Sequence, residues 1–420
     1  MSVVTGLLSL LFSSCSSNDS VQKKPQENAS PPLELAPVST DYSKLTGKIT
    51  DHIACDAQPQ LSYCLYLPSA YSSSKTFPVI FIFDAHGDGK LPVEKYHNLA
   101  EESGFILIAS NNSRNGIQYD SLLSMAKDMM SDASGKISIE AKRKYVMGFS
   151  GGARVAGVVA ATEPEVAGVI GCGAAYLDEN TKSHAQQFFF GFAGKDDFNL
   201  LEMFRMHAYL ENAGVKNYFE VFEGKHEWPD SAMMRNAFRM LTVKDSKEKQ
   251  MLEQNISRHT VTSALAKTFE AESGLQKKYL DAFSSENIFW WKNEITNLQQ
   301  CGNTGTDKEK VHQCRRLLAY IGVAVYSFSN NAIKTHSDAD AEKLLQIYSM
   351  VDSQNSEQKF LAAILRARQG DNLRALALLN EAVGLGFNDL SRMESEPDFQ
   401  NLRGMTDYSN LISKIKAQQP

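Results

Sequence analysis

One serine in this sequence stands in the setting that nucleophilic catalysis requires. Ser150 is the centre of a G-x-S-x-G motif that begins at Gly148. The motif follows a strand-like stretch at 144–147 and precedes a pattern of small residues typical of a helix at 153–162, so it predicts a tight strand-to-helix turn. Such a turn lifts the serine oxygen above the edge of a sheet, at a helix N-terminus whose dipole favours developing negative charge. The chemistry predicted for Ser150 is attack on an acyl carbonyl.

A serine nucleophile needs a base, and the base needs a carboxylate that orients it. Two later loops supply these groups, the acid before the base. Asp196 and Asp197 directly follow a strand-like run at 188–193. His226 comes shortly after another such run at 218–222. The sequence therefore predicts His226 as the general base and one of the two aspartates as the acid.

The elements that must position these groups form a repeating pattern. The chain has 420 residues, which suits two domains. From 44 to 245 apolar strand-like runs alternate with helix patterns, and 77–83 is nearly continuous in apolar residues, as buried parallel strands are. Repeated βα units predict an α/β domain with a mostly parallel sheet and helices on both faces. From 246 to 420 only helical patterns remain, which predicts a second, all-α domain.

One segment of the helical region resembles a tetratricopeptide (TPR) helix pair. Ala363, Ala375 and Ala382 have the spacing of its small-residue positions, and a turn at 370–372 separates the two helices. Only one unit matches well, whereas such repeats normally need neighbours to bury their faces. The sequence leaves two interpretations open, a TPR-like domain and a generic helical bundle.

Residues 44–243 resemble the α/β-hydrolase superfamily. The most similar groups in it are the secreted feruloyl and acetylxylan esterases, the polyhydroxybutyrate depolymerases and the dienelactone-hydrolase-like proteins. The stretch at 148–156 is similar to their nucleophile elbow, and that at 224–229 to their His-x-Trp-Pro turn. The resemblance implies a Ser-Asp-His triad that needs no metal or cofactor. It favours Asp197 over Asp196 as the acid, because the acid of these families lies three residues after a glycine.

An oxyanion hole needs two backbone N–H donors aimed at the developing alkoxide. Gly151, directly after the nucleophile, is the first candidate. The loop after the apolar run resembles the His-Gly-x-Gly loop of these families, and Gly87 or Asp88 is the second candidate. Asp84 is unusual so close to the hole, because a carboxylate there would oppose an oxyanion unless it is paired. His86 is the predicted partner of Asp84 and is expected to brace its loop.

The N-terminal part of the sequence is predicted to be an export signal followed by a flexible tether. The apolar stretch at 1–15 ends in small residues before Cys15 and resembles a bacterial lipoprotein signal, in which that cysteine is lipidated. Two features depart from the pattern, since no Lys or Arg precedes Lys23 and Phe12 stands where Leu is usual. Residues 16–43 are rich in Pro and Ser, which predicts a flexible tether. The chain is therefore expected to be an exported bacterial lipoprotein, periplasmic or at the outer membrane or cell surface, that meets the membrane only through Cys15.

Export would place the cysteines in an oxidising compartment. Cys55 and Cys64 are close in sequence, as are Cys301 and Cys314, so both pairs are predicted to be disulfides. Cys172 lies in a strand-like apolar run and is expected to be a free, buried thiol. The spacings fit no zinc site.

Charge and motifs together favour one function over others. With 43 basic and 49 acidic residues the net charge is −6, which argues against a nucleic-acid partner. The leading hypothesis is a serine hydrolase of carboxylic esters, small or glycan-linked, that works through an acyl-enzyme. The alternatives are a peptidase with the same triad, and a non-catalytic surface lipoprotein whose helical domain binds a protein or a glycan. In either role the helical domain is a candidate site for a protein partner.

Overall fold

The computed structural model describes four stretches of the chain, 41–176, 187–243, 246–258 and 263–418. The predicted signal at 1–15 with Cys15, and the predicted tether up to residue 40, lie outside the described residues. No helix within the described stretches is long and apolar enough to cross a membrane.

The chain divides into two compact units, 1–262 and 263–420, and each is described by itself. The change of pattern in the sequence predicts the division at 245/246, before helix α7 (Ser246–Arg258). In the structure α7 contacts α6 and β8, and its Glu253 accepts a hydrogen bond of 2.6 Å from the Tyr218 hydroxyl. Helix α7 therefore belongs with the first unit.

The first unit is built on an eight-stranded sheet in the order β1-β2-β4-β3-β5-β6-β7-β8. β2 pairs antiparallel with β1 and with β4, and all the other neighbours pair parallel. The strands are β1 (Ile49–Ala54), β2 (Ser62–Tyr66), β3 (Phe77–Phe83), β4 (Ile106–Ser110), β5 (Ile139–Phe149), β6 (Val166–Cys172), β7 (Phe188–Gly194) and β8 (Asn217–Phe222).

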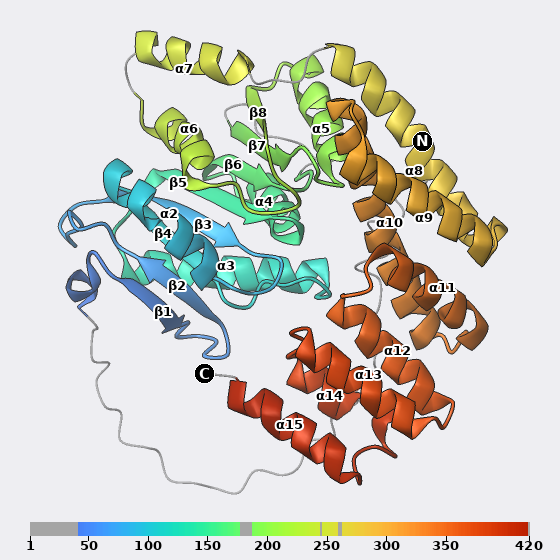
Figure 1. Ribbon diagram of the computed structural model, residues 1–420. Helices are drawn as coiled ribbons and strands as arrows, with labels where there is room; N and C mark the ends of the chain where they lie inside the picture. The colour runs from blue at the N-terminus through green and yellow to red at the C-terminus, as the bar shows by residue number, and fades with distance from the viewer. Residues whose placement is uncertain (1–40, 177–186, 244–245, 259–262, 419–420) are drawn as a thin grey trace, which may run out of the picture. The chain divides into compact units, whose positions relative to one another are not determined.

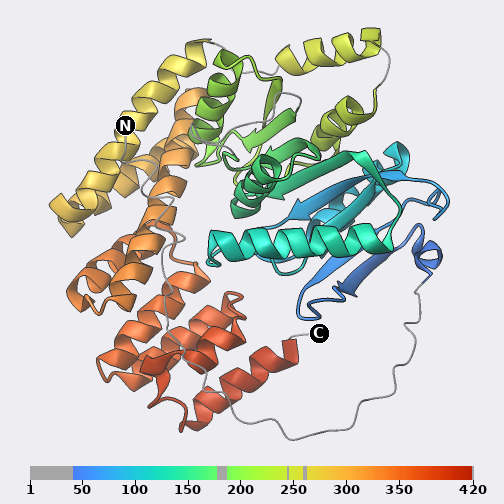
Figure 2. The ribbon, with the colours of Figure 1, turned by 180° about the vertical axis from the view of Figure 1, so that it is seen from behind.

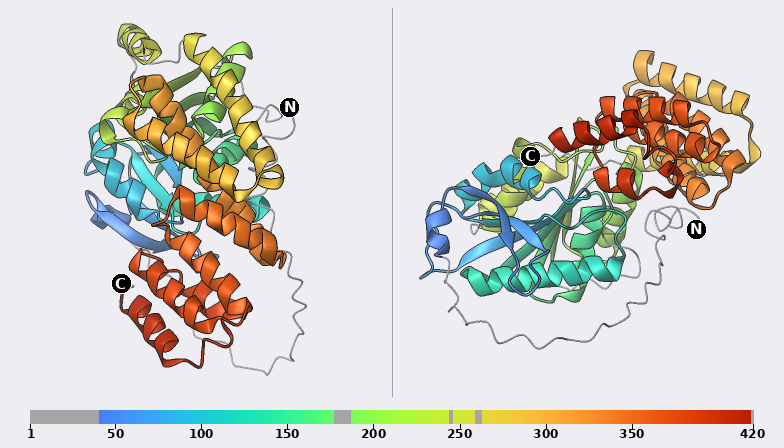
Figure 3. Two further views of the ribbon diagram at one scale, coloured as in Figure 1. Left: turned by 45° about the vertical axis from the view of Figure 1, so that its right-hand side comes forward. Right: turned by 90° about the horizontal axis from the view of Figure 1, so that it is seen from below.

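Helices cover both faces of this sheet. α2 and α6 lie in front of it in Figure 1, and α3, α4 and α5 come forward in the reverse view of Figure 2. The right-hand view of Figure 3 shows the sheet between α2 and α3. The helices are α2 (Lys90–Ser103), α3 (Tyr119–Lys136), α4 (Gly151–Thr162), α5 (Leu200–Asn212), α6 (Ser231–Thr242) and α7, after a short 3-10 helix, η1 (Tyr42–Leu45).

The apolar run at 77–83 becomes the central strand β3, whose side chains from Pro78 onward are all buried. Such complete burial is expected where helices cover a parallel strand on both faces. The sheet, its two helical layers and the tight turn after β5 confirm the predicted α/β-hydrolase fold class. Because β5, β7 and β8 run in the same direction, their carboxyl ends meet at one edge, where binding sites of such sheets lie.

The second unit is helical throughout its described residues, as the sequence predicted. α12 and α13 form an antiparallel pair in which Ala363, Ala375 and Ala382 are fully buried, so the helices approach closely. The TPR-like character of this pair stays a prediction. The elements are α8 (Ser263–Ser285), α9 (Ile288–Thr304), α10 (Lys308–Lys334), α11 (Asp338–Val351), α12 (Ser356–Arg368), α13 (Asn372–Gly384), α14 (Leu390–Ser395), η2 (Pro397–Phe399) and α15 (Thr406–Gln418).

The two predicted disulfides have different outcomes. Cys301 and Cys314 are bonded and join α9 to α10. The predicted bond between Cys55 and Cys64 is wrong, since both thiols are free. Cys55 donates its N–H to Leu61, three residues before Cys64, so about 10 Å of strand separates the two.

The two cysteines also face different layers. Cys55 has Asp132 and Lys136 of α3 among its charged neighbours, whereas Cys64 packs in the core cluster beneath α2. Burial raises the pKa of the Cys55 thiol to about 11 and that of Cys64 to about 12. Cys172 is also free and fully buried, as predicted.

Candidate active site

Ser150 forms the turn between β5 and α4. Its backbone has φ 53° and ψ −122°, a conformation that costs a non-glycine residue about 1–3 kcal/mol. Side chains are excluded beside it, because a Cβ at Gly148 would collide with the carbonyl of Gly152, and a Cβ at Gly152 with that of Phe83. The Ser150 N–H donates to the carbonyl of Cys172 at the end of β6 (2.8 Å). The sequence thus builds the tight turn expected of a nucleophile elbow.

The structure brings Ser150 together with His226 and Asp197. The Ser150 Oγ lies 2.9 Å from His226 Nε2. His226 Nδ1 lies 2.9 Å from Asp197 Oδ1, which also accepts the N–H of Asn199 (2.8 Å). The Asp197 carboxylate is fully buried, whereas the His226 ring is 21% exposed. An acceptor on Nδ1 and a hydroxyl on Nε2 suit a histidine that takes the serine proton.

Both ring nitrogens of His226 are taken by Ser150 and Asp197, which leaves neither for Asp196, the other candidate acid. Its backbone N–H donates to the carbonyl of Gly224 (2.9 Å), and the N–H of Lys195 donates to Phe222 (2.8 Å). These two bonds fasten the loop of Asp197 to the loop of His226. The geometry therefore distinguishes the neighbouring aspartates by their contacts.

Two aromatic rings pack against the imidazole of His226. The ring centroids of Phe149 and Phe198 lie 4.7 and 4.3 Å from that of His226. Phe149 also packs against Trp228, at 5.4 Å. The His-x-Trp-Pro turn therefore contributes packing under the histidine as well as the histidine itself.

The candidate oxyanion donors differ in their surroundings. The N–H of Gly151 belongs to the first turn of α4, where N–H groups have no partner within the helix. The N–H of Gly87 turns back towards the carbonyl of Asp84 (3.5 Å), and the Asp88 carboxylate accepts the N–H of Leu91 (3.0 Å), near the start of α2. From Gly87 onward the loop runs along 109–114, because those residues surround Gly87 and Gly89.

Asn115 is a residue of this site that no sequence motif indicated. Its N–H donates to the carbonyl of Ala85 (2.8 Å), and its side-chain Oδ1 lies directly against Gly151. Asn115 therefore links the Ala85–His86 part of the predicted oxyanion loop to Gly151. Asn115 lies in the loop after β4, and only the fold places that loop beside the elbow.

The Asp84 carboxylate has hydrogen-bond partners, as expected of a carboxylate so close to the predicted oxyanion hole. One carboxylate oxygen accepts the N–H of His86 (2.8 Å) and lies 3.1 Å from its Nδ1, and the other accepts from Trp228 Nε1 (2.9 Å). Burial works to raise the pKa of Asp84, but these hydrogen bonds outweigh it and hold the pKa below its ordinary value. The hydrogen bond to Asp84 raises the pKa of His86.

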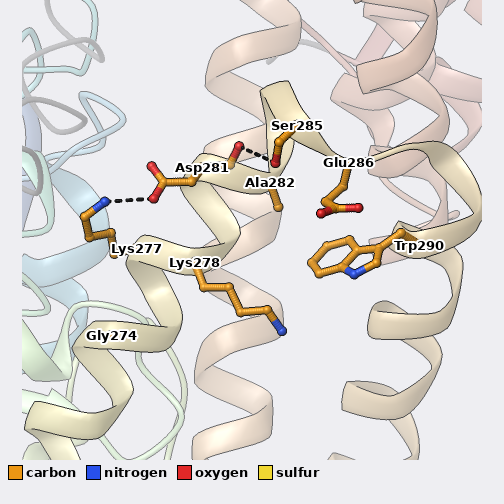
Figure 4. A pocket seen from close by; sticks show the side chains of 8 residues that line it. All are labelled: Gly274, Lys277, Lys278, Asp281, Ala282, Ser285, Glu286 and Trp290. Atoms are coloured by element: carbon orange, nitrogen blue, oxygen red, sulfur yellow. Dashed lines mark hydrogen bonds and ion pairs between the residues drawn. The ribbon is translucent and has the colours of Figure 1, made fainter.

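The second unit has a cavity of about 460 Å³ between α8 and α9 (Figure 4). Trp290 lines it, whereas its neighbour Trp291 is fully buried. Lys277 pairs with Asp281 (2.7 Å), and the Lys278 ammonium lies 5.2 Å from the centre of the Trp290 ring. The cavity's lining residues all come from these two helices and the turn between them. In the described parts of the chain no three His, Cys, Asp or Glu side chains are grouped so as to hold a metal ion.

No protein-family model matches the chain, and no curated protein matches its sequence. Among solved structures, a ferulic acid esterase is similar to it at 17% identity and a TM-score of 0.40, over 46% of this chain and 97% of the esterase. An S-formylglutathione hydrolase from Staphylococcus aureus is similar at 15% identity and a TM-score of 0.37, over 44% and 93%. Esterase B from Lactobacillus rhamnosis is similar at 17% identity and a TM-score of 0.36, over 49% and 88%.

Proposed function

We propose that the protein is a serine hydrolase that cleaves carboxylic esters through an acyl-enzyme. One observation carries the proposal. An unbroken chain of contacts runs from Ser150 Oγ through both nitrogens of His226 to the buried carboxylate of Asp197, with 2.9 Å at each of the two histidine contacts. That sequence of hydroxyl, imidazole and carboxylate is what serine activation requires.

The reaction proceeds in two halves. Ser150 Oγ attacks the carbonyl carbon of the ester while His226 Nε2 takes the serine proton, and a tetrahedral oxyanion forms. His226 then gives this proton to the leaving alkoxide, which departs as the alcohol and leaves an acyl-serine. Water, deprotonated by His226, attacks the acyl-serine. The second tetrahedral intermediate collapses to the carboxylic acid, and Ser150 takes its proton back from His226. Asp197 stabilises the imidazolium that forms in each half.

The N–H of Gly151 supports one side of the oxyanion. The second donor proposed is the N–H of Ala85 rather than that of Gly87 or Asp88, because Asn115 links the Ala85 stretch to Gly151, whereas the N–H of His86 already donates to Asp84. Two such donors, fixed before the reaction begins, stabilise charge that appears only in the transition state.

We also propose that the chain is an exported bacterial lipoprotein, lipidated at Cys15 and held by the 16–43 tether in the periplasm or at the outer membrane or cell surface. The lipobox-like sequence supports this proposal, and so does the disulfide of Cys301 and Cys314, since such bonds persist in oxidising compartments. The substrate class proposed for the enzyme is a small or glycan-linked ester. The helical unit is proposed, separately, to bind a protein partner.

A fluorophosphonate probe, combined with hydrolysis of p-nitrophenyl and feruloyl esters, tests the enzymatic proposal. The wild-type chain should be labelled at Ser150, and Ser150→Ala should lose labelling and at least about 10³-fold in turnover while it remains folded. Ser74→Ala, which changes an exposed serine on another loop, should behave as the wild type. A wild-type chain that is neither labelled nor active would sink the proposal and favour a non-catalytic surface protein.

A further inference from the structure

Asp84 is a fully buried carboxylate that the serine mechanism does not use. It directly follows β3, and both of its oxygens accept hydrogen bonds from other parts of the site. One oxygen accepts the backbone N–H of His86, in the loop from which the second oxyanion donor comes. The other accepts the indole N–H of Trp228, two residues after His226. One side chain therefore contacts two loops that are far apart in the sequence.

The Trp228 end of this link leads to the imidazole. Trp228 is 7% exposed and packs against Phe149, whose ring in turn packs against His226. Tyr96 of α2 covers Trp228 from another side, at 5.9 Å between ring centroids. A shift of Trp228 would be passed through Phe149 to the imidazole, since a packed interior has no free space to absorb it.

The His86 end leads to the elbow. The carbonyl of Ala85 accepts the N–H of Asn115, and the Asn115 side chain rests on Gly151. The bond from the Asp84 carboxylate to the N–H of His86 closes a tight turn around Ala85. The conformation of that turn decides where the N–H of Ala85 points, since the N–H of His86 is held by Asp84.

We propose that Asp84 is a positioning residue that fixes the oxyanion loop and the His226 loop relative to each other, one carboxylate oxygen bonding to each. This inference rests on the serine-hydrolase function proposed above. A carboxylate suits the place better than an amide, because both partners are N–H donors and only a carboxylate has an acceptor oxygen for each. Its charge is compensated by these hydrogen bonds and by His86, so it need not oppose the oxyanion.

Asp84→Asn tests the proposal, because it keeps the shape but turns an NH2 group towards one of the two donors. We expect kcat for p-nitrophenyl acetate to fall roughly 10- to 100-fold, as for a small misplacement of reacting groups, with KM nearly unchanged. Trp228→Phe removes the indole N–H that donates to the other carboxylate oxygen, and it should also lower kcat. The double variant should be no slower than the slower single variant, because either change breaks the one link between the two loops.

Glu101→Gln is the matched control. Glu101 accepts hydrogen bonds from the Tyr66 hydroxyl (2.6 Å) and the Ser69 N–H (2.9 Å), near the end of α2 away from the serine. Both donors bond to Glu101 Oε2, so the glutamine oxygen can accept both bonds, and kcat should stay at the wild-type value. Wild-type kcat in Asp84→Asn, a loss confined to KM, or additive effects in the double variant would each overturn the inference.

Two measurements keep the test decisive. If Asp84→Asn does not fold, Trp228→Phe alone decides, and an unchanged kcat in it refutes the link. Fluorophosphonate labelling of Ser150 separates this inference from the function on which it rests. A wild type that is not labelled fails the proposed function, whereas a labelled wild type with a fully active Asp84→Asn variant fails only the positioning role.

Discussion

Replacing Asp197 by asparagine should remove a charge from the site without removing its hydrogen bonds. Asp197 Oδ1 accepts from both His226 Nδ1 and the N–H of Asn199, whereas Oδ2 has no hydrogen-bond partner among the described residues. Because both partners donate to the same atom, the amide oxygen takes its place and the amide NH2 takes the other. The histidine tautomer is then kept, and only the negative charge is lost.

The lost charge matters when His226 becomes an imidazolium. The carboxylate is fully buried and its Oδ1 lies 2.9 Å from His226 Nδ1, which places the two charge centres about 4 Å apart. At an effective dielectric constant of about 20 this separation gives an interaction of about 4 kcal/mol. Since each 1.4 kcal/mol is a factor of ten, kcat should fall roughly 10³-fold. KM should change little, because the ester meets this charge only through the histidine.

Steady-state hydrolysis of p-nitrophenyl acetate, with thermal melting as a check on folding, measures the effect. Asp196→Asn is the comparison, because it removes the same charge from the next residue, whereas both ring nitrogens of His226 are taken by Ser150 and Asp197. It should stay within about threefold of the wild type, as substitutions outside special sites do. The reasoning is refuted if Asp197→Asn retains more than about a tenth of wild-type kcat, or if Asp196→Asn is the inactive variant.

Three further predictions concern the stability of the fold. The hydrogen bond to Asp84 raises the pKa of His86 above its ordinary 6.5. The stability that His86 adds to the fold is therefore complete below pH 6.5 and is lost as the pH rises through the pKa of His86 in the folded protein. His86→Gln should therefore lower the melting temperature more at about pH 5.5 than at about pH 9, and equal losses would contradict the pairing. Cys301→Ser opens a disulfide between residues 13 apart and should lower the free energy of unfolding by about 3 kcal/mol; dithiothreitol should reproduce the loss in the wild type but not in the variant. Arg316→Met leaves Glu272 buried without the bond of 2.7 Å that pairs them and should cost about 3–5 kcal/mol in urea unfolding, most of which Glu272→Met should restore.

The parts of the site that follow strands could be predicted because parallel strands end at one edge of a sheet. A local motif located Ser150, and two apolar runs located the loops of Asp197 and His226. The choice between Asp196 and Asp197 could not be made in this way. Neighbouring residues in a loop differ in the direction of their side chains, and backbone bonds such as that from Asp196 to Gly224 set that direction.

Features that depend on contacts between distant segments could not be predicted from the sequence. The prediction for Cys55 and Cys64 used their closeness along the chain, but the register of β1 and β2 keeps the two apart. Asn115 carries no motif, and its contact with Gly151 exists only because the loop after β4 lies beside the elbow. Arg316 of α10 and Glu272 of α8 form a buried pair although they are 44 positions apart in the sequence. No pattern of spacing indicates contact at that separation.

The backbone at Ser150, with its positive φ, has a consequence for laboratory evolution. A glycine adopts this conformation at no steric cost, so Ser150→Gly should raise the melting temperature while it abolishes turnover. Libraries selected only for heat resistance or soluble expression would therefore enrich chains that have lost the nucleophile. Any programme to stabilise this protein must screen for ester turnover in every round, because the two properties conflict at this one residue.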